Sequence, residues 1–318
     1  MVSIMVAHPV KIVNNTGANI SNYQQVVIAP MCNNCMNASV SNVFWAYDPA
    51  GSSIIPSWLG NQIGSSSAPT NANNGSLVYF LKIGTTIPAG ATQTIYMIFA
   101  DRGTTVWDGV NTGVAPLWTS VYGQYDNGTK VFNIYNNFAG TTLPSNYSIN
   151  SNNGTTSTYS VNNGVFLENY YLGSNFSITI SNAIYGLMKF SAAGSVSQFN
   201  SRFGYIINNE NFLIIGGNSS YPISYLTNYD PSSNKAYYMT IPSFYNQMVS
   251  LGLWTDGTTT TFGMVNENIY KNTVDFYVPS NSNSNITVQA LYENAIANVY
   301  AIMVGNAPPN GIMPTVLF

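Results

Sequence analysis

Two short segments of this sequence place aromatic rings beside a carboxylate. Trp254, Asp256 and Gly257 fall together at one expected turn, and Glu168 is followed closely by Tyr170 and Tyr171. Aromatic faces pack against the C–H side of a sugar ring, whereas carboxylates and amides bind its hydroxyl groups. We therefore take Trp254, Asp256, Tyr170, Tyr171 and Glu168 as candidate glycan-binding residues. The structural alternative is that Trp254 ends a core strand, Asp256-Gly257 forms a hairpin turn and the tyrosines pack inside a sandwich.

The carboxylates do not form a recognisable catalytic pattern. Glycoside hydrolysis needs two carboxylates flanking the sugar, but Glu168, Glu210 and Glu267 each stand alone in their strands or turns. The hydrolase strand motif Glu-x-Asp-x-x-Glu is absent, as is a Gly-x-Ser-x-Gly elbow, and a Ser-His-Asp triad would have to use His8. We expect no catalytic residues and no enzymatic activity.

Both cysteines lie in one short motif, Cys32-Asn-Asn-Cys35. Two thiols cannot build a four-cysteine zinc site, and His8 has no metal-ligand spacing to them. A small-loop disulfide in an oxidising environment is predicted, and two free thiols are the alternative. No cofactor and no metal site are predicted; calcium is the one ion to consider, but no dense Asp cluster calls for it.

The composition excludes several classes of function. The chain has 318 residues, of which only 6% are charged, and its net charge is −3. Eight cations cannot neutralise many phosphates, so nucleic-acid binding is not expected. No apolar run reaches the roughly 18 residues of a membrane span, so membrane insertion is not expected either.

The same composition points to an extracellular setting. Amides and hydroxyls replace the missing charges, and ten Asn-x-Ser/Thr sequons occur, about as many as so much Asn, Ser and Thr produces by chance. The start of the sequence lacks the basic region of a signal peptide. We expect either a trimmed mature chain or a protein that leaves the cell by another route, as virion components do.

Short runs rich in Val, Ile, Tyr, Phe and Thr recur about every ten residues between Gly, Asn, Asp and Pro turns, and no long helical periodicity is present. This pattern predicts an all-β fold of antiparallel, jelly-roll-like sandwiches. The expected strands are Tyr23–Ile28, Ser76–Ile83, Gln93–Ala100, Gly164–Leu167, Phe176–Ile180, Arg202–Ile207, Asn211–Ile215, Lys235–Ile241, Thr258–Val265, Thr273–Val278 and Tyr300–Val304.

Two domains are predicted, a β-sandwich over residues 1–120 and a second sandwich over residues 121–318. The boundary follows Asp108–Pro116, which is rich in Gly, Asn and Pro. Trp45 and Trp58 are predicted in the core of the first domain. The apolar ends Val2–Val6 and Thr315–Phe318 suit either edge strands of their own domain or strand addition to a neighbouring subunit.

Three motifs stand out in the first part of the sequence: Lys11-Ile-Val-Asn-Asn-Thr-Gly17, Ile54-Ile-Pro-Ser-Trp58 and Ile87-Pro-Ala-Gly-Ala-Thr-Gln-Thr-Ile-Tyr-Met97. Together they resemble an uncharacterised β-domain family of archaeal and bacterial surface proteins. Tyr122-Gly-Gln-Tyr-Asp-Asn-Gly128, followed by Val131-Phe132 and Asn137-Phe138, is similar to the start of its usual partner, a concanavalin-A-like or laminin-G-like lectin domain. The closing Pro308-Pro-Asn-Gly-Ile-Met-Pro314 resembles the ends of such proteins in hot-spring archaea and their viruses. The resemblance implies a concanavalin-A-like second domain and supplies no catalytic residue.

Taken together, these features predict a non-enzymatic virion structural or host-attachment protein of an archaeal virus, with lectin-like glycan binding and a location on the virion surface. The expected partners are host cell-surface glycans or glycoproteins and other virion or filament subunits, in a homo-oligomer. The first alternative is a cellular adhesin or pilus-like filament subunit on an archaeal cell surface. The second is a polysaccharide-acting glycoside hydrolase.

Overall fold

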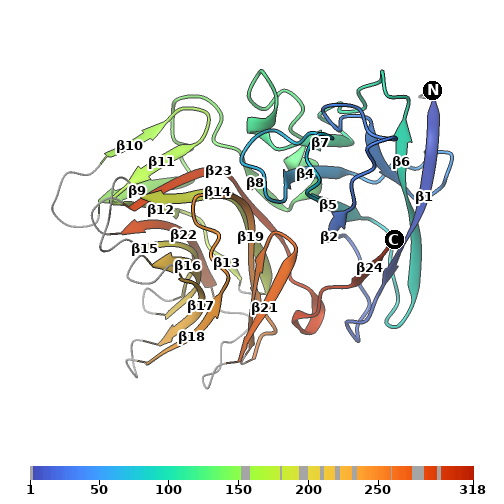
Figure 1. Ribbon diagram of the computed structural model, residues 1–318. Coiled ribbons are helices and arrows are strands. Elements are labelled where there is room, and N and C mark those ends of the chain that lie inside the picture. The colour runs from blue at the N-terminus through green and yellow to red at the C-terminus, as the bar shows by residue number, and fades with distance from the viewer. Residues whose placement is uncertain are drawn as a thin grey trace. The chain divides into compact units, whose positions relative to one another are not determined.

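The structure, a computed structural model, is built almost entirely of antiparallel strands (Figure 1). It describes residues 3–151, 158–179, 181–192, 200–207, 211–218, 223–230, 235–258, 260–273, 283–291 and 295–318. Within these ranges, helix is confined to α1 (Gly128–Val131) and the 3-10 turns η1 (Pro116–Trp118) and η2 (Pro309–Gly311). The all-β prediction is confirmed. Glu210 and most of the expected strand Thr273–Val278 lie outside the described residues.

The chain divides into two compact units, which are described separately. The first unit comprises Met1–Asn136 together with Pro308–Phe318, and the second comprises Asn137–Ala307. The sequence predicted the boundary after residue 120 and placed the C-terminal residues in the second domain. In this division, residues 121–136 and 308–318 belong to the first unit instead.

The first unit contains two sheets. One has the strand order β24-β1-β6-β3, and the other has the order β2-β5-β4-β7, in which only β4 and β7 run parallel. Their strands are β1 (Ile4–Val13), β2 (Tyr23–Ala29), β3 (Val43–Ala46), β4 (Ser57–Gln62), β5 (Leu77–Ile83), β6 (Thr92–Ala100), β7 (Thr112–Val114) and β24 (Thr315–Leu317). The short strand β8 (Ile134–Asn136) belongs to neither of these two sheets. Trp45 and Trp58 are fully buried in the first unit, as predicted.

Residues 121–136 pack with the first unit because they complete an aromatic cluster around Trp58. The ring of Phe132 lies 5.7 Å from that of Trp58 and 5.2 Å from that of Phe80. The indole N–H of Trp58 donates to the Asp126 carboxylate at 2.9 Å, and the Tyr135 hydroxyl donates to its other oxygen at 2.7 Å. A motif that resembled the opening of the second domain therefore supplies a hydrogen-bonded centre of the first.

The C-terminal residues also return to the first unit. β24 pairs with β1 through Lys11–Leu317, Ile12–Val316 and Val13–Thr315 (Figure 1). The Asn310 amide donates to the Thr16 carbonyl at 2.8 Å. Thr315–Leu317 is thus an edge strand of its own unit, one of the two roles expected for this apolar end.

The second unit is a sandwich of two antiparallel sheets. One sheet has the order β10-β11-β23-β14-β19-β20-β21 and the other β18-β17-β16-β15-β22-β12-β9. Their strands are β9 (Tyr147–Ser151), β10 (Thr158–Val161), β11 (Val165–Glu168), β12 (Tyr170–Ser174), β13 (Ile178–Thr179), β14 (Asn182–Ala192), β15 (Asn200–Ile207), β16 (Asn211–Asn218), β17 (Ile223–Asp230), β18 (Lys235–Ile241), β19 (Met248–Thr255), β20 (Thr260–Val265), β21 (Asn268–Thr273), β22 (Asn283–Leu291) and β23 (Ala295–Asn306).

A tyrosine fixes which face of β15 points into this sandwich. The hydroxyl of Tyr205 donates to the backbone carbonyls of Asn182, at 2.6 Å, and Leu253, at 3.1 Å, both in the opposite sheet. Phe203 and Tyr205 are fully buried. Because side chains alternate along a strand, Arg202 and Gly204 face outward.

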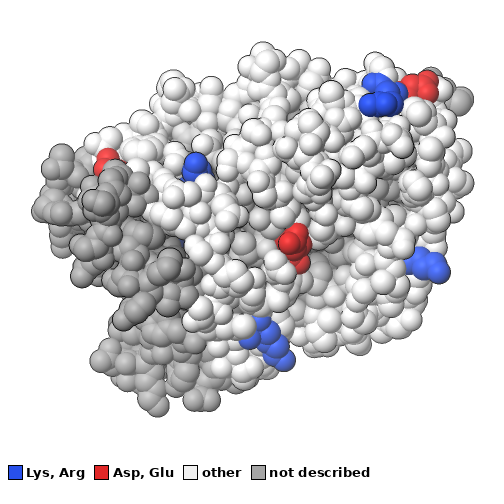
Figure 2. All heavy atoms as spheres, viewed as in Figure 1, with Lys and Arg blue, Asp and Glu red and all other residues white. Residues whose placement is uncertain are grey.

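Charged residues are sparse on the surface. Figure 2 shows Lys, Arg, Asp and Glu as a few small spots among uncharged residues on the face that it presents. Among the described residues, no helix is long and apolar enough to cross a membrane. Solvation of this surface depends on amide, hydroxyl and backbone groups.

Candidate glycan-binding site

Trp254 is a fully buried residue of β19 in the second unit. Its side chain is 0% exposed, and its ring stacks on Phe262 with centroids 5.9 Å apart and an interplanar angle of 4°. Trp254 and Phe262 are opposed in the β19–β20 pairing, which brings their rings together. Trp254 therefore offers no exposed face to a sugar in this structure, and its role here is packing.

Asp256 closes the turn between β19 and β20. One carboxylate oxygen accepts hydrogen bonds from the backbone N–H of Thr258 at 2.8 Å, the Thr258 hydroxyl at 2.7 Å and the Thr260 N–H at 3.1 Å. Partial burial by itself raises the pKa of Asp256, but these hydrogen bonds lower it by more. The pKa of Asp256 therefore lies below its ordinary value of 3.8. An acid of lowered pKa is ionised near neutral pH and is unsuited to donate a proton.

Glu168, Tyr170 and Tyr171 lie where the chain crosses from one sheet to the other. Glu168 ends β11, Tyr170 begins β12, and Asn169 between them has a left-handed φ of 59°. Tyr170 shares a strand face with the buried Leu172, and its ring meets that of Tyr159 edge-on at 5.2 Å. Tyr171 faces the other way, to the outside of its sheet.

The predicted residues form two separate groups. Glu168 is opposite Ile296 on β23, whereas the Trp254 end of β19 lies near Val304, because Leu253 and Val304 both pair with Ile184. Ile296 and Val304 are eight positions apart along the strand, roughly 27 Å at about 3.4 Å per residue. Trp254 and Asp256 therefore cannot act on one sugar together with Glu168, Tyr170 and Tyr171.

Tyr171 belongs instead to a row of polar side chains across four strands. It pairs with Asn150 on β9 and with Gln289 on β22, and Gln289 pairs with Arg202 on β15. All four side chains are on the outer face established by the inward Tyr205, and all are at least partly exposed. Directly opposed side chains lie about 5 Å apart at Cβ. We call Asn150, Tyr171, Gln289 and Arg202 the outer-face row.

A glycine positions Arg202 in this row. Gly216 on β16 is opposite Arg202, and a Cβ there would come within 3.2 Å of the arginine Cγ and 2.5 Å of the Ser201 carbonyl oxygen. The missing side chain therefore leaves room for the aliphatic part of Arg202 to lie against β16.

The outer-face row combines an aromatic ring with hydrogen-bonding side chains. Tyr171 supplies an aromatic surface, Asn150 and Gln289 supply amide donors and acceptors, and Arg202 supplies guanidinium donors. Only Tyr171 was predicted. Arg202 could have been noticed in the sequence, since it is one of only eight cations and begins an otherwise apolar strand. Nothing in the sequence, however, shows that Arg202 lies in line with Gln289 and Asn150.

The described glutamates are far apart. Glu168 is on β11, and Glu267 follows β20, four strands away in the same sheet. At about 4.8 Å per strand this is roughly 19 Å, whereas the two carboxyl groups of a glycosidase lie about 5 to 9.5 Å apart. These two glutamates do not make a hydrolytic pair.

Cys32 and Cys35 form a disulfide in the first unit, with Cα atoms 5.2 Å apart. The turn is supported by the Asn42 amide, which donates to the Cys35 carbonyl at 2.8 Å. Within the part of the chain that the structure describes, no group of three His, Cys, Asp or Glu side chains is arranged to hold a metal ion.

No family model and no curated protein sequence matches this chain. Solved structures with a similar fold cover about half of it. They include a family 16 glycosyl hydrolase from Mycobacterium smegmatis, with 11% identity over 54% of this chain and 99% of its own, at a TM-score of 0.42. β-Agarase A from Zobellia galactanivorans has 12% identity over 55% and 90%, at 0.42, and Bacillus licheniformis β-glucanase has 9% over 54% and 97%, at 0.41. At this level of similarity, no activity, substrate or residue role of those proteins can be assigned to this chain.

Proposed function

We propose that this chain is a non-enzymatic carbohydrate-binding protein of an extracellular surface, and that it holds glycans on the outer-face row of its second unit. The observation that carries the proposal is the alignment of Tyr171, Gln289 and Arg202 across three adjacent strands. The aromatic ring would pack on the C–H face of a sugar, and the amide and guanidinium would bind its hydroxyl oxygens.

Two further features support this proposal. With 6% charged residues, the chain depends on uncharged polar groups for its surface, and such groups exchange hydrogen bonds with a polyol without the cost of stripping water from an ion. The Cys32–Cys35 disulfide is the form that cysteines take in oxidising compartments.

The absence of catalysis is part of the proposal. Its support is the roughly 19 Å separation of the strands that carry Glu168 and Glu267, together with the hydrogen-bonded turn that engages Asp256. Incubation of the protein with a glycan that it binds should release no new reducing ends. Release of reducing ends in proportion to protein concentration would establish the glycoside hydrolase alternative.

The binding test uses isolated archaeal cell envelopes, with and without periodate oxidation of their glycans. We expect the protein to bind intact envelopes and to lose binding after oxidation. Tyr171→Ala should weaken binding at least tenfold, since it removes the aromatic surface of the row. The matched control is Tyr270→Ala, because Tyr270 is also half-buried but lies on β21 of the other sheet. Binding that survives oxidation, or that both variants lose equally, would refute the site.

The biological setting that we propose is a virion structural or host-attachment protein of an archaeal virus, assembled from several copies. A cellular adhesin or filament subunit would use the same row. Immunogold labelling separates the two settings: label on purified virions supports the viral one, and label on uninfected cells supports the cellular one.

A further inference from the structure

The glycan-binding proposal makes no use of the ten Asn-x-Ser/Thr sequons, which the fold places in very different surroundings. A sequon accepts an N-linked glycan on the amide nitrogen of its asparagine, and the attached sugar is bulky and points into solvent. The asparagine must therefore be exposed, and its amide nitrogen must not be needed inside the protein. The side chains of Asn153 and Asn218 are not among those described. These two conditions separate the other sequons.

Two sequons are buried and serve the fold. Asn14 is 0% exposed, and its amide donates to the carbonyls of Ala18 and Ile87, both at 2.8 Å. Asn127 is 1% exposed, and its amide donates to the Ser57 carbonyl at 3.0 Å. A glycan on either nitrogen would remove the donor of a buried carbonyl and push a sugar into the core. The folded chain therefore has no room for a glycan at these two positions.

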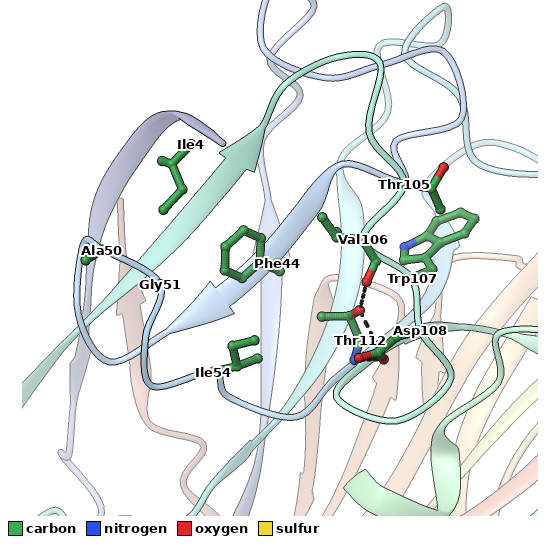
Figure 3. Close-up of a pocket in the computed structure, with 10 residues that line it drawn as sticks. All are labelled: Ile4, Phe44, Ala50, Gly51, Ile54, Thr105, Val106, Trp107, Asp108 and Thr112. Atoms are coloured by element: carbon green, nitrogen blue, oxygen red, sulfur yellow. Dashed lines mark hydrogen bonds between the residues drawn. The ribbon is translucent and has the colours of Figure 1, made fainter. Parts of the chain in front are cut away.

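The amide of a third sequon holds a neighbouring segment in place. Asn37 is partly buried and donates to the Ser41 hydroxyl at 3.0 Å and to the Thr104 carbonyl at 3.2 Å. Thr104 leads into Thr105 and Val106, which line the hollow shown in Figure 3. A glycan on Asn37 would detach this segment from the turn that Asn37 belongs to.

Two more sequons meet near the end of β12. The Asn285 amide donates to the Ser174 carbonyl at 2.8 Å, and Thr287, the hydroxyl residue of the same sequon, is 0% exposed. Asn175 is exposed, but its amide donates to the Ser145 carbonyl at 3.1 Å. Both amide nitrogens are therefore engaged in holding the chain together.

Asn146 meets both conditions. It is the third residue of the turn before β9, which the Tyr147 N–H closes by donating to the Pro144 carbonyl at 2.9 Å. Its side chain is exposed, and within the described part of the chain its amide makes no hydrogen bond. Ser148, the hydroxyl residue of its sequon, is partly exposed. Asn146 thus presents a free amide nitrogen at an ordered turn.

Asn74 and Asn19 meet the same conditions in the first unit. The loop of Asn74 is anchored by the buried Gln62, whose amide donates to the carbonyls on either side of Asn74 at 3.1 and 3.0 Å. Asn74 itself is exposed, and its side chain has no hydrogen bond to a described residue. Asn19 is exposed and accepts the Ala89 N–H at 3.1 Å through its oxygen, so its nitrogen is not used. The hydroxyl residues of both sequons are at least partly exposed.

We propose that Asn19, Asn74 and Asn146 carry N-linked glycans in the secreted protein. The sugar comes from an oligosaccharide on a lipid phosphate carrier. The amide nitrogen forms a bond to C1 of the first sugar while the bond from C1 to the phosphate oxygen breaks; the nitrogen loses one proton, and the lipid phosphate leaves. The glycans add hydroxyl groups to a chain of which only 6% of residues are charged. This inference rests on the extracellular location proposed above and not on the outer-face row.

The test is mass spectrometry of the full chain secreted by an archaeal host that carries out N-glycosylation, with the host's own surface glycoprotein as proof that the pathway is active. We expect glycans on Asn19, Asn74 and Asn146, and none on Asn14 or Asn127. Asn14 and Asn19 fall in one proteolytic peptide, so fragmentation that keeps the sugar attached must locate it. A secreted, folded chain with no glycan at any of the three positions, or with one at Asn14 or Asn127, would overturn the proposal.

Variants of one sequon separate specific attachment from other gains in mass. Asn146→Gln and Ser148→Ala should each remove the mass of one glycan, whereas Ser148→Thr should keep it, because the hydroxyl group is retained. The matched control is Asn162→Gln, since Asn162 is exposed but lies in no sequon; it should leave the mass unchanged. An unchanged mass in Asn146→Gln would exclude this site. Mass and envelope binding are separate measurements, so either proposal can fail while the other stands.

Discussion

Replacing Asp126 by alanine should destabilise the first unit strongly, because one carboxylate serves three donors there. It accepts the indole N–H of the fully buried Trp58 at 2.9 Å, the hydroxyl of Tyr135 at 2.7 Å and the backbone N–H of Gly128 at 3.1 Å. Trp58 is fully buried and has no water to replace this partner, and the Tyr135 ring is stacked on Phe132 with centroids 6.0 Å apart.

The size of the effect follows from those partners. A hydrogen bond to a charged group contributes about 1.5 to 3 kcal/mol, and a buried donor left without a partner costs about 1 to 3 kcal/mol. Counting the Trp58 bond in full and the other two in part, we expect Asp126→Ala to lower the free energy of unfolding by about 3 to 4 kcal/mol. Asp126→Asn keeps one acceptor oxygen and should lose about half as much.

Tryptophan fluorescence during urea unfolding measures this change. Trp45, Trp58, Trp107 and Trp118 lie in the first unit and only Trp254 in the second, so the signal reports mainly on the first unit. Asp101→Ala, at an exposed turn, is the matched control and should change stability by less than about 0.5 kcal/mol. If Asp126→Ala unfolds within that same margin of the native protein, the carboxylate does not hold the cluster and the reasoning is wrong.

Three further predictions concern other parts of the chain. Trp254→Ala should lower the free energy of unfolding of the second unit by about 3 to 5 kcal/mol, as expected for a buried tryptophan. The folded variant Trp254→Phe should keep its affinity for envelopes. A loss of that affinity would show that Trp254 takes part in glycan binding. Replacing Cys32 and Cys35 together by serine should lower the free energy of unfolding by about 2 kcal/mol, the value for a four-residue loop. Thermal unfolding of the variant is compared with that of the native protein before and after reduction. If the reduced native protein and the variant melt at the same temperature, the loss is due to the disulfide bond. The lowered pKa of Asp256 contributes stability that is present above its ordinary value of 3.8 and is lost as the pH falls through the lower folded value. Between pH 5 and 2, Asp256→Asn should therefore show a smaller acid-induced loss of stability than the native chain; equal slopes would contradict the turn's role.

The strand pattern was readable in the sequence. Expected strands such as Gln93–Ala100, Lys235–Ile241 and Asn211–Ile215 coincide with β6, β18 and the first part of β16 to within a few residues. Alternating β-branched and aromatic residues between glycine-rich turns are local properties. They specify a strand without reference to the rest of the chain.

The grouping of the site residues was not readable. Trp254 and Tyr171 looked alike in the sequence, as aromatic residues next to polar ones, but Trp254 is fully buried against Phe262, whereas Tyr171 is partly exposed beside Asn150 and Gln289. Residue composition gives the chemistry of a side chain and not the face on which it lies. A shift of one residue in register would reverse every face.

The sequence by itself determined an all-β chain with few charges, two cysteines close enough to bond and a large share of tyrosine and asparagine. The tertiary structure decided that residues 308–318 return to the first unit, that Asp126 joins that unit's core and that Arg202 stands beside Gln289. Each of these depends on strand order and register between distant segments, which are set by the packing of the whole sheet and not by any local run of residues.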